Sequence, residues 1–332
     1  MSNRQTLAGI RRTINQKGGP AMESARKTII QNFRDDSYSS QALRYFSKVT
    51  LQGALPVFPA LINMSFEAVG GNGEKTVPFG EAIVLISAAA DLHDDVIDKS
   101  KMKGSKQTVL GKFDSSSAIL AGDILLAQGF RQLTEAAANS QIDSEKIIRL
   151  VSEAILEISR AQALETQLHN RSDLDPDEYL DVIRLKAVVP EMSMKIGAVL
   201  GNAKTEAVET LGHFGRTYGI NSLIIEEFTD LLNFEEVRNR LKNECPPLTV
   251  IYALQNREIK NKLAPLLSAE FSQEVYDSIV QTVLDSKEVE VLGDMLAENA
   301  EREEKILAKV IKGKMGEDLK NLLLVPLKYL EF

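Results

Sequence analysis

The sequence predicts an all-α protein, a single-domain bundle of roughly a dozen helices around a central cavity. Almost every long segment repeats its apolar residues with helical periodicity, and we find no convincing strand. The 332 residues are 44% hydrophobic and 26% charged, which is ample for a sizeable core. No Pro-, Ser- or Gly-rich tract divides the chain, so we expect residues 1–332 to form one domain.

In the N-terminal third, residues 1–20 end in a Gly-Gly-Pro sequence, which predicts an N-terminal arm or a short helix followed by a turn. Helices are expected over residues 21–33, 40–66 and 78–98, the second interrupted by prolines at positions 56 and 59. Residues 99–112 hold five lysines and two glycines, so we expect a mobile basic loop there.

Acidic and polar residues mark the starts of the later helices. Asp114 or Ser115, and then Asp143, can cap helices that reach about residues 138 and 169. Pro176, with acids in the same turn, starts a helix that reaches about residue 200. The remaining helices are expected over residues 205–234, 247–255, 271–285, 289–310 and 316–327.

Charge and composition exclude several classes of protein. The net charge of −8 argues against a general nucleic-acid binder. The single cysteine, Cys245, rules out an internal disulfide and fits a reducing compartment. No apolar run is long enough to span a membrane, and the polar start has no signal-peptide core. We therefore expect a cytoplasmic protein.

The segment Ala88–Asp98 carries the strongest chemical signal. Asp91, Asp94, Asp95 and Asp98 follow the i, i+3, i+4, i+7 spacing that places side chains on one helical face. Four carboxylates on one face repel each other, and Mg²⁺ prefers such oxygen ligands together with substrate phosphates. A solvated acidic helix end is the alternative, but here the acids directly follow an apolar, core-type stretch.

A second acidic patch repeats this spacing. Glu226, Glu227 and Asp230 also follow an apolar helical stretch. In a helical bundle two such ends can face each other across one cavity, where Mg²⁺ ions could bind a diphosphate and stabilise its charge as it leaves. Taken alone, the patch could equally be an acidic turn on the surface.

Several motifs together resemble the trans-isoprenyl diphosphate synthases, the polyprenyl synthetase family. They are Asp94–Asp98 preceded by Leu92-His93, the Ala118–Leu126 segment, Lys186 within Ile183–Ala187, the Glu226–Asp230 patch and the Pro247–Leu254 stretch. The resemblance covers roughly residues 40–260, and its first two motifs are the most specific.

The resemblance implies the isoprenoid synthase-like fold and the family's reaction. An allylic prenyl diphosphate would ionise under three Mg²⁺ ions, and isopentenyl diphosphate would attack the carbocation. Asp94, Asp95 and Asp98 would hold two ions, and the second patch, Glu226 and Asp230 with Glu227, would hold the third. Lys186 would bind the allylic diphosphate as a point charge, unless it is an ordinary helix lysine. The family also implies a homodimer.

Departures from the family pattern affect mainly the second diphosphate site. The basic motif expected near residues 50–56 reads Leu-Gln-Gly-Ala-Leu over residues 51–55, with no cation. Ser87 stands where the family has His or Gln, and Lys103 replaces an arginine pair without its bidentate fork. The later Gly-Lys reads Glu244-Cys245. Arg238 and Arg240 could reach a diphosphate, but a solvated helix end is the simpler expectation.

Three functions fit these matches and departures. The first is a prenyltransferase that uses isopentenyl diphosphate through a divergent site. The second keeps the ionisation step but uses another acceptor or cyclises the substrate. The third is a non-catalytic subunit that forms a heteromer with an active homologue, and an unrelated helical metal-binding protein is a remote fourth. The intact Asp94 motif counts against the third, and the missing basic residues count against the first. We favour the first because it is the usual reaction of the family that the sequence resembles.

Substrate length is expected to depend on a channel beneath the first motif. Ala89 and Ala90, one turn before Asp94, are small and would leave the channel open, which predicts a long prenyl chain. Gln162 resembles a position that lines this channel. Helix packing alone could equally explain both alanines.

Overall fold

The computed structural model describes residues 3–140, 142–169, 171 and 173–327 and confirms the all-α class. Within these ranges the chain forms sixteen α-helices, one π-helical and one 3₁₀ turn, and a single two-stranded hairpin. No helix in the described part of the chain is both long and apolar enough to cross a bilayer. The division into domains and the central cavity stay predictions.

The predicted N-terminal arm is wrong. α1 is one continuous helix, Asn3–Asn32, that passes through the Gly-Gly-Pro sequence. Its inner face is part of the core, where Ile14 is 4% exposed. Gly18 serves close packing rather than a turn, because a Cβ there would lie 2.2 Å from the backbone oxygen of Pro56. Pro20 costs the helix one hydrogen bond, and tertiary packing outweighs that loss.

The next segments lead to the first acidic motif. They are α2 (Tyr38–Phe46), the π-helical turn Ser47–Leu51, α3 (Val57–Ala68), the 3₁₀ turn Glu74–Thr76 and α4 (Val77–Ile97). Residues 52–56 are not helical, and Pro56 caps α3. The predicted interruption at Pro56 is therefore confirmed, whereas Pro59 fits within the first turn of α3, where its missing N–H costs nothing.

The segment predicted as a loop over residues 99–112 contains regular structure, including two strands that the sequence analysis did not find. β1 (Met102–Lys103) pairs antiparallel with β2 (Lys106–Gln107), and α5 (Val109–Lys112) follows. Gly104 has φ +57°, which suits a two-residue hairpin turn. The Thr108 hydroxyl accepts from the backbone N–H of Gly111 and caps α5. The hairpin folds back over the end of α4.

The middle of the chain forms long helices whose predicted caps are confirmed. α6 (Ser115–Asn139) is capped by Asp114 and α7 (Ser144–Leu168) by Asp143. α8 (Pro176–Lys186) starts with a capping box formed by Asp175 and Glu178. The expected single helix to residue 200 is two, because α9 (Val188–Leu200) follows a break at Ala187. Pro190 has no N–H to donate to the carbonyl of Lys186.

The C-terminal half includes two helices that the sequence analysis missed, α11 and α13. The elements are α10 (Thr205–Leu231), α11 (Phe234–Asn243), α12 (Leu248–Ala253), α13 (Arg257–Leu267), α14 (Gln273–Leu284), α15 (Lys287–Val310) and α16 (Lys314–Leu327). Asn233 caps α11, accepting from the backbone N–H groups of Glu235 and Glu236. This cap turns the chain sharply at the end of α10.

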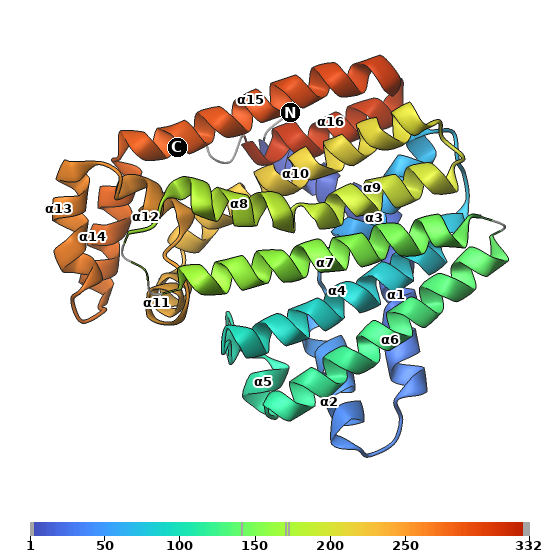
Figure 1. Cartoon of the computed structure of the whole chain (residues 1–332), viewed down its shortest axis with the longest axis horizontal. Helices are drawn as coiled ribbons and strands as arrows, with labels where there is room; N and C mark the ends of the chain where they lie inside the picture. Colours follow the sequence, from blue (N-terminus) through green and yellow to red (C-terminus); the bar gives the residue numbers. More distant parts are fainter. Residues whose placement is uncertain (1–2, 141, 170, 172, 328–332) are drawn as a thin grey trace.

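The arrangement of the helices brings the acidic ends together. α4, α7, α8, α9 and α10 run along the long axis of the molecule, and α11 and α12 lie toward the end of the molecule to which the C-terminus of α4 points (Figure 1). α4 packs closely on α6, where a Cβ at Gly122 would meet the His93 ring at 2.3 Å. The small residues of α6 thus fix the position of α4.

Candidate active site

The first acidic motif lies at the C-terminal end of α4, and its carboxylates point in two directions. Asp95 is 3% exposed and forms an ion pair of 3.0 Å with Lys103, which also bonds Asp91. Lys103 comes from β1, so the hairpin places this cation against the helix. Asp94 and Asp98 are half-buried and face α7 and α8 instead.

Lys103 partly compensates the charge of its two carboxylates, because one cation pairs with two acidic side chains. Burial lowers the pKa of Lys103, but the negative charges of Asp91 and Asp95 outweigh this and raise it. Burial raises the pKa of Asp95 to about 6, although Lys103 partly offsets it. The ammonium group of Lys103 is already bonded to two carboxylates, which counts against a contact with substrate. The predicted contact of Lys103 with substrate stays a prediction.

Asp94 and Asp98 lie in a crowded, negatively charged environment. Burial raises the pKa of Asp98 to about 8, and the charges of Asp94, Glu244 and Glu165 add to this. Burial also raises the pKa of Asp94, which Lys186 partly offsets. Without a bound cation these carboxylates repel each other. A divalent cation bound between them would reduce this repulsion.

Two residues of the central helices contact this cluster. Gln162 on α7 donates from Nε2 to Oδ1 of Asp98 at 3.3 Å, so its side chain contacts the first motif, and its expected place in the channel stays a prediction. Lys186 at the end of α8 bonds Glu165 on α7. Burial lowers the pKa of Lys186, but Glu165 and then Asp94 and Asp98 raise it above its ordinary value.

Lys186 also links the two acidic ends. Its positive charge lowers the pKa of Asp94 and Asp98 on α4, partly offsetting the effect of burial. It acts in the same way on Glu226 on α10, where loss of hydration is the larger effect and raises the pKa. Lys186 is therefore near enough to influence carboxylates of both patches.

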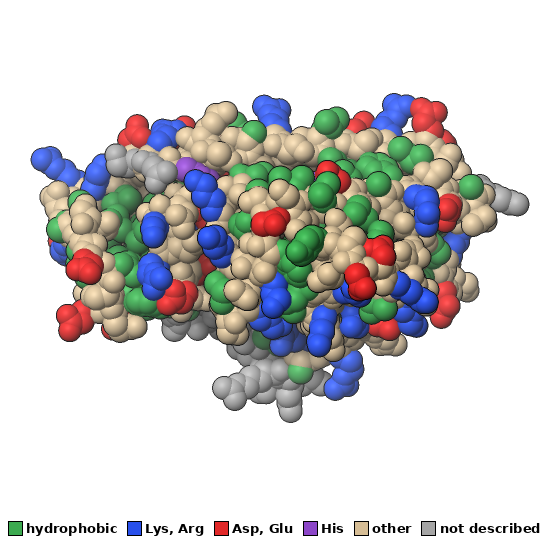
Figure 2. Space-filling model, turned by 90° about the horizontal axis from the view of Figure 1, so that it is seen from below, with side chains coloured by type: hydrophobic (Ala, Val, Ile, Leu, Met, Phe, Trp, Pro, Cys, Tyr) green, Lys and Arg blue, Asp and Glu red, His purple; other side chains and the backbone are tan. Residues whose placement is uncertain are grey.

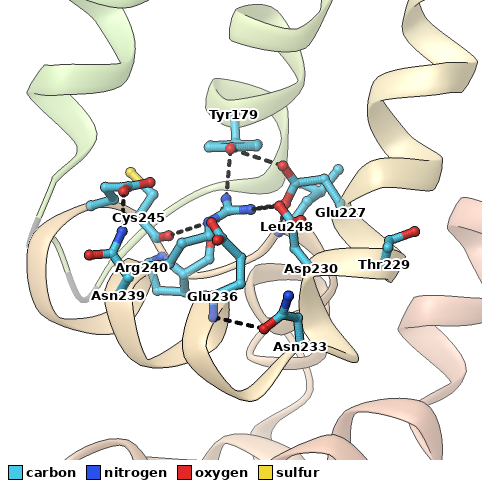
Figure 3. A network of polar contacts seen from close by, with 12 residues as sticks. Tyr179, Glu227, Thr229, Asp230, Asn233, Glu236, Asn239, Arg240, Cys245 and Leu248 are labelled. Carbon is cyan, nitrogen blue, oxygen red and sulfur yellow. Dashed lines mark hydrogen bonds and ion pairs between the residues drawn. The ribbon is translucent and has the colours of Figure 1, made fainter. Parts of the chain in front are cut away.

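The second patch differs from the first because a buried arginine occupies it (Figure 3). Arg240 on α11 is 4% exposed, and its Nη1 lies 3.0 Å from Oε2 of Glu227 and 3.0 Å from Oδ2 of Asp230. Burial raises the pKa of Asp230 to about 7 in spite of this partner. The expectation that Arg240 lies at a solvated helix end is wrong.

Tyr179 extends this network to the centre of the site. Its hydroxyl accepts from Nη2 of Arg240 at 2.7 Å and lies 3.1 Å from Oε1 of Glu227 and 3.3 Å from Oε1 of Glu165. The hydroxyl has one proton, so it donates to one of these two carboxylates at a time. Through Glu165 the network continues to Lys186.

The two patches differ in how well they fit magnesium. In the described part of the chain, no three acidic, His or Cys side chains converge closely enough to hold one ion by themselves. Asp94 and Asp98 fit the usual Mg²⁺ site, in which one or two carboxylates act with phosphate oxygens and water. The second patch has only Glu226 free, because Glu227 and Asp230 bond Arg240.

The remaining predicted substrate residues lie on α4. Ser87 is half-buried and Ala90 is exposed, one or two turns before Asp94 on the same face. Ala89 points the other way, is 1% exposed and belongs to an apolar cluster with Leu85 and other core residues. Their contacts with a prenyl chain stay predictions, for which Ala90 is the better placed alanine.

Sequence reasoning missed Tyr179 as a member of the site, and it considered Arg240 but preferred a solvated helix end. Tyr179 stands one turn after the start of α8, where it reads as an ordinary core residue. Arg240 reaches the patch only because α11 folds back on α10. The available signal was Asn233, followed by Glu235 and Glu236, a sequence typical of a new helix start.

These features describe an all-α bundle with a carboxylate-rich cluster at the C-terminal ends of α4 and α10, and comparisons with known proteins assign its family. The chain belongs to the polyprenyl synthetase family, which matches residues 40–283. The geranylgeranyl diphosphate synthase of Methanosarcina mazei is 30% identical over 185 residues, 55% of this chain and 57% of that protein. The octaprenyl diphosphate synthase of Escherichia coli is 26% identical over 252 residues, 73% of this chain and 75% of that protein.

Solved structures share the fold over nearly the whole chain. A geranylgeranyl pyrophosphate synthetase from Pyrococcus horikoshii has a TM-score of 0.81 at 21% identity, covering 97% of this chain and 99% of that one. A decaprenyl diphosphate synthase from Rhodobacter capsulatus has the same TM-score at 18% identity, covering 97% and 100%. The resemblance inferred from the motifs is thus confirmed at the level of family and fold.

Proposed function

We propose that the protein is a magnesium-dependent trans-prenyltransferase that joins an allylic prenyl diphosphate to isopentenyl diphosphate. The observation that carries this proposal is the meeting of Asp94, Asp98 and Lys186 at one end of a polyprenyl synthetase bundle. The names of the relatives point to the same class of reaction. A cytoplasmic location and a homodimer remain part of the proposal.

The chain's own residues would act on the diphosphate in distinct ways. Lys186 would bind it as a point charge, and Asp94 and Asp98 would hold Mg²⁺. When bound, Mg²⁺ supplies positive charge that stabilises the departing diphosphate. Gln162 orients Asp98 through its hydrogen bond, and Lys103 keeps Asp95 and Asp91 paired.

A second candidate keeps the ionisation step but replaces the acceptor. Residues 51–55 carry no cation, and Gln52, Gly53, Ala54 and Leu55 are exposed. A hydroxyl or aromatic acceptor would need no cation at this position. Lys48 and Lys106 are nearby, but Lys106 bonds the backbone oxygen of Val49 at 3.1 Å.

One assay separates these functions. Purified protein with Mg²⁺ is incubated with allylic diphosphates of ten, fifteen and twenty carbons, with and without labelled isopentenyl diphosphate. The proposal expects labelled, longer diphosphates, with a preference for long allylic substrates. Pyrophosphate release without label incorporation would favour another acceptor or cyclisation.

Two variants make the assay specific. Asp94→Asn should abolish pyrophosphate release, whereas Asp123→Asn, at an exposed carboxylate on α6, should not. A folded wild-type protein that releases no pyrophosphate with any of these substrates would contradict the proposal and favour a non-catalytic subunit.

A further inference from the structure

We propose that Arg240 is a fixed internal cation that takes the place of a metal ion at the second acidic patch. This inference rests on the proposed function, since it concerns how the same site binds a diphosphate. The resemblance alone implied that Glu226, Glu227 and Asp230 hold a third Mg²⁺. The contacts of Arg240 instead give this patch a structural role, in which it connects neighbouring helices. Metal-dependent binding of a diphosphate then depends on the first motif.

Every donor of the Arg240 guanidinium has an acceptor. Nη1 lies 3.0 Å from both Glu227 and Asp230, and Nη2 lies 2.7 Å from the Tyr179 hydroxyl and 3.3 Å from the backbone oxygen of Pro246. Nε donates to the backbone oxygen of Cys245 at 3.0 Å. A guanidinium has five N–H donors, so the group is fully bonded in this position.

The acceptor side of the ion pair is equally occupied. Glu227 is 7% exposed, and its Oε2 accepts from Arg240 and from the backbone N–H of Leu248 at 2.6 Å. Its Oε1 lies 3.1 Å from the Tyr179 hydroxyl. A metal ion at Glu227 would have to displace these donors and would place a second positive charge beside the buried Arg240, which is strongly unfavourable.

The backbone contacts show why this arrangement is fixed. Arg240 and Glu227 together bond the backbone of Cys245, Pro246 and Leu248, the segment that joins α11 to α12. As Figure 3 illustrates, the arginine lies between the end of α10 and Tyr179 of α8. The pair therefore holds α8, α10 and α12 together at this end of the bundle.

Counting bound metal ions tests the proposal without requiring turnover. Wild-type protein is titrated with Mn²⁺ in the presence of inorganic pyrophosphate, and bound Mn²⁺ is measured by electron paramagnetic resonance and calorimetry. Asp230→Asn should leave the number of bound ions and their affinity within about twofold of wild type. Asp94→Asn, the matched control on α4, should weaken binding by at least about tenfold. Loss of one Mn²⁺ per chain in Asp230→Asn would overturn the proposal.

A second variant tests whether removal of Arg240 creates a metal site at the second patch. Arg240→Gln frees Glu227 and Asp230, so it should bind one Mn²⁺ more than wild type, with its fold checked by circular dichroism. An unchanged count in folded Arg240→Gln would contradict the proposal, and if this variant does not fold, Asp230→Asn decides. Because no turnover is measured, absence of prenyl transfer would refute the proposed function and leave the Mn²⁺ comparison between variants intact.

Discussion

At the scale of single residues, the site consists of charges that compensate one another within the chain. Arg240 pairs with Glu227 and Asp230, Lys103 pairs with Asp91 and Asp95, and Lys186 pairs with Glu165. Asp98 forms no ion pair with a lysine or arginine in the described part of the chain. Burial and the neighbouring negative charges therefore raise its pKa to about 8. It is the carboxylate whose environment a metal ion would change most.

The raised pKa values predict how stability depends on pH. The pKa of Asp98 in the folded protein is about 8, above its ordinary value, so the folded state keeps a proton that the unfolded chain loses. This contributes stability that is complete below about pH 4 and lost as pH rises through about 8. Asp230 and Glu244, both at about 7, act in the same direction.

Thermal unfolding with EDTA and with Mg²⁺ should show this dependence. From about pH 6 to about pH 9, we expect the melting temperature of the metal-free protein to fall and the gain from added Mg²⁺ to grow, because the ion binds deprotonated carboxylates. Asp98→Asn should weaken both trends. A Mg²⁺ gain that is equal at all pH values would contradict the assignment of Asp98.

Lys186 should contribute to binding the allylic diphosphate. Lys186→Gln is expected to lower kcat/KM by about 10- to 100-fold, the effect of losing a charged hydrogen bond worth roughly 1.5–3 kcal/mol. Lys186→Arg should retain part of the activity. The matched control is Lys195→Gln, because Lys195 also lies between two carboxylates, Glu191 and Glu209, but on α9. Equal losses at both lysines would argue against a role specific to Lys186.

Local spacing was enough to predict some of these residues and not others. Asp94 and Asp98 are one turn apart on one helix, and Lys186 ends an amphipathic segment, so their positions follow from the sequence. The pairing of Arg240 with Glu227 depends on α11 folding back across a sharp turn. That contact is set by tertiary packing, which charge spacing along one helix does not encode.

At the scale of elements, the two glycines of α1 have opposite roles. A Cβ at Gly18 would lie 2.2 Å from the backbone oxygen of Pro56, whereas a Cβ at Gly19 would meet nothing within 4 Å. Gly18→Ala should therefore lower the free energy of unfolding by about 1–3 kcal/mol through overpacking. Gly19→Ala should raise it by about 0.5–1 kcal/mol, because alanine favours the helix.

Denaturant unfolding of the two variants measures this difference. The pair is internally controlled, since both changes add one methyl group to adjacent positions of the same helix. Similar effects of the two substitutions would mean that α1 does not approach Pro56 as closely as described. The same measurement tests the correction of the expected N-terminal arm, because an arm would tolerate both alanines.

The two faces of α4 predict different outcomes for its alanines. Ala90 is exposed on the face of Asp94, so Ala90→Phe should be tolerated by the fold and shorten the longest product. Ala89 is 1% exposed in the core, so Ala89→Phe should lower the melting temperature through overpacking. Product analysis and thermal unfolding of both variants check this. An unchanged product spectrum with Ala90→Phe would exclude Ala90 from the channel.

The starts of helices were predictable from the sequence, whereas the break between α8 and α9 and the hairpin after α4 were not. Asp114 and Asp143 cap their helices as expected, and a helix starts at Pro176 as expected, because the signals for a helix start are local. The break at Ala187 depends on a proline three residues later, and the hairpin after α4 depends on the turn at Gly104. A continuous helix through Gly18 was not predictable, because its reason is the closeness of Pro56.

At the scale of the whole molecule, exposed apolar side chains are concentrated in one part of the described chain. Most of the large ones belong to α1, α2, α6 or the segments beside them: Ile30, Tyr38, Leu55, Ile97, Met102, Ile119 and Leu120. α2, α6 and one end of α1 lie on the lower side of the molecule in Figure 1, and the view from below shows apolar side chains exposed among lysines and arginines (Figure 2). Such a surface is typical of a protein–protein contact.

The expected homodimer should therefore form through α6. Ile119 and Leu120 are 42% and 52% exposed at its start, while its other face packs on α4 beneath the first motif. Leu120→Glu should place a charge in this contact and convert a dimer to a monomer in light scattering coupled to gel filtration. The matched control is Val291→Glu, at a residue that is 54% exposed on α15, on the opposite side of the bundle (Figure 1). Because α6 positions α4, the monomer should also lose activity if the dimer contact supports the active site. A Leu120→Glu protein that stays dimeric would show that the interface lies elsewhere.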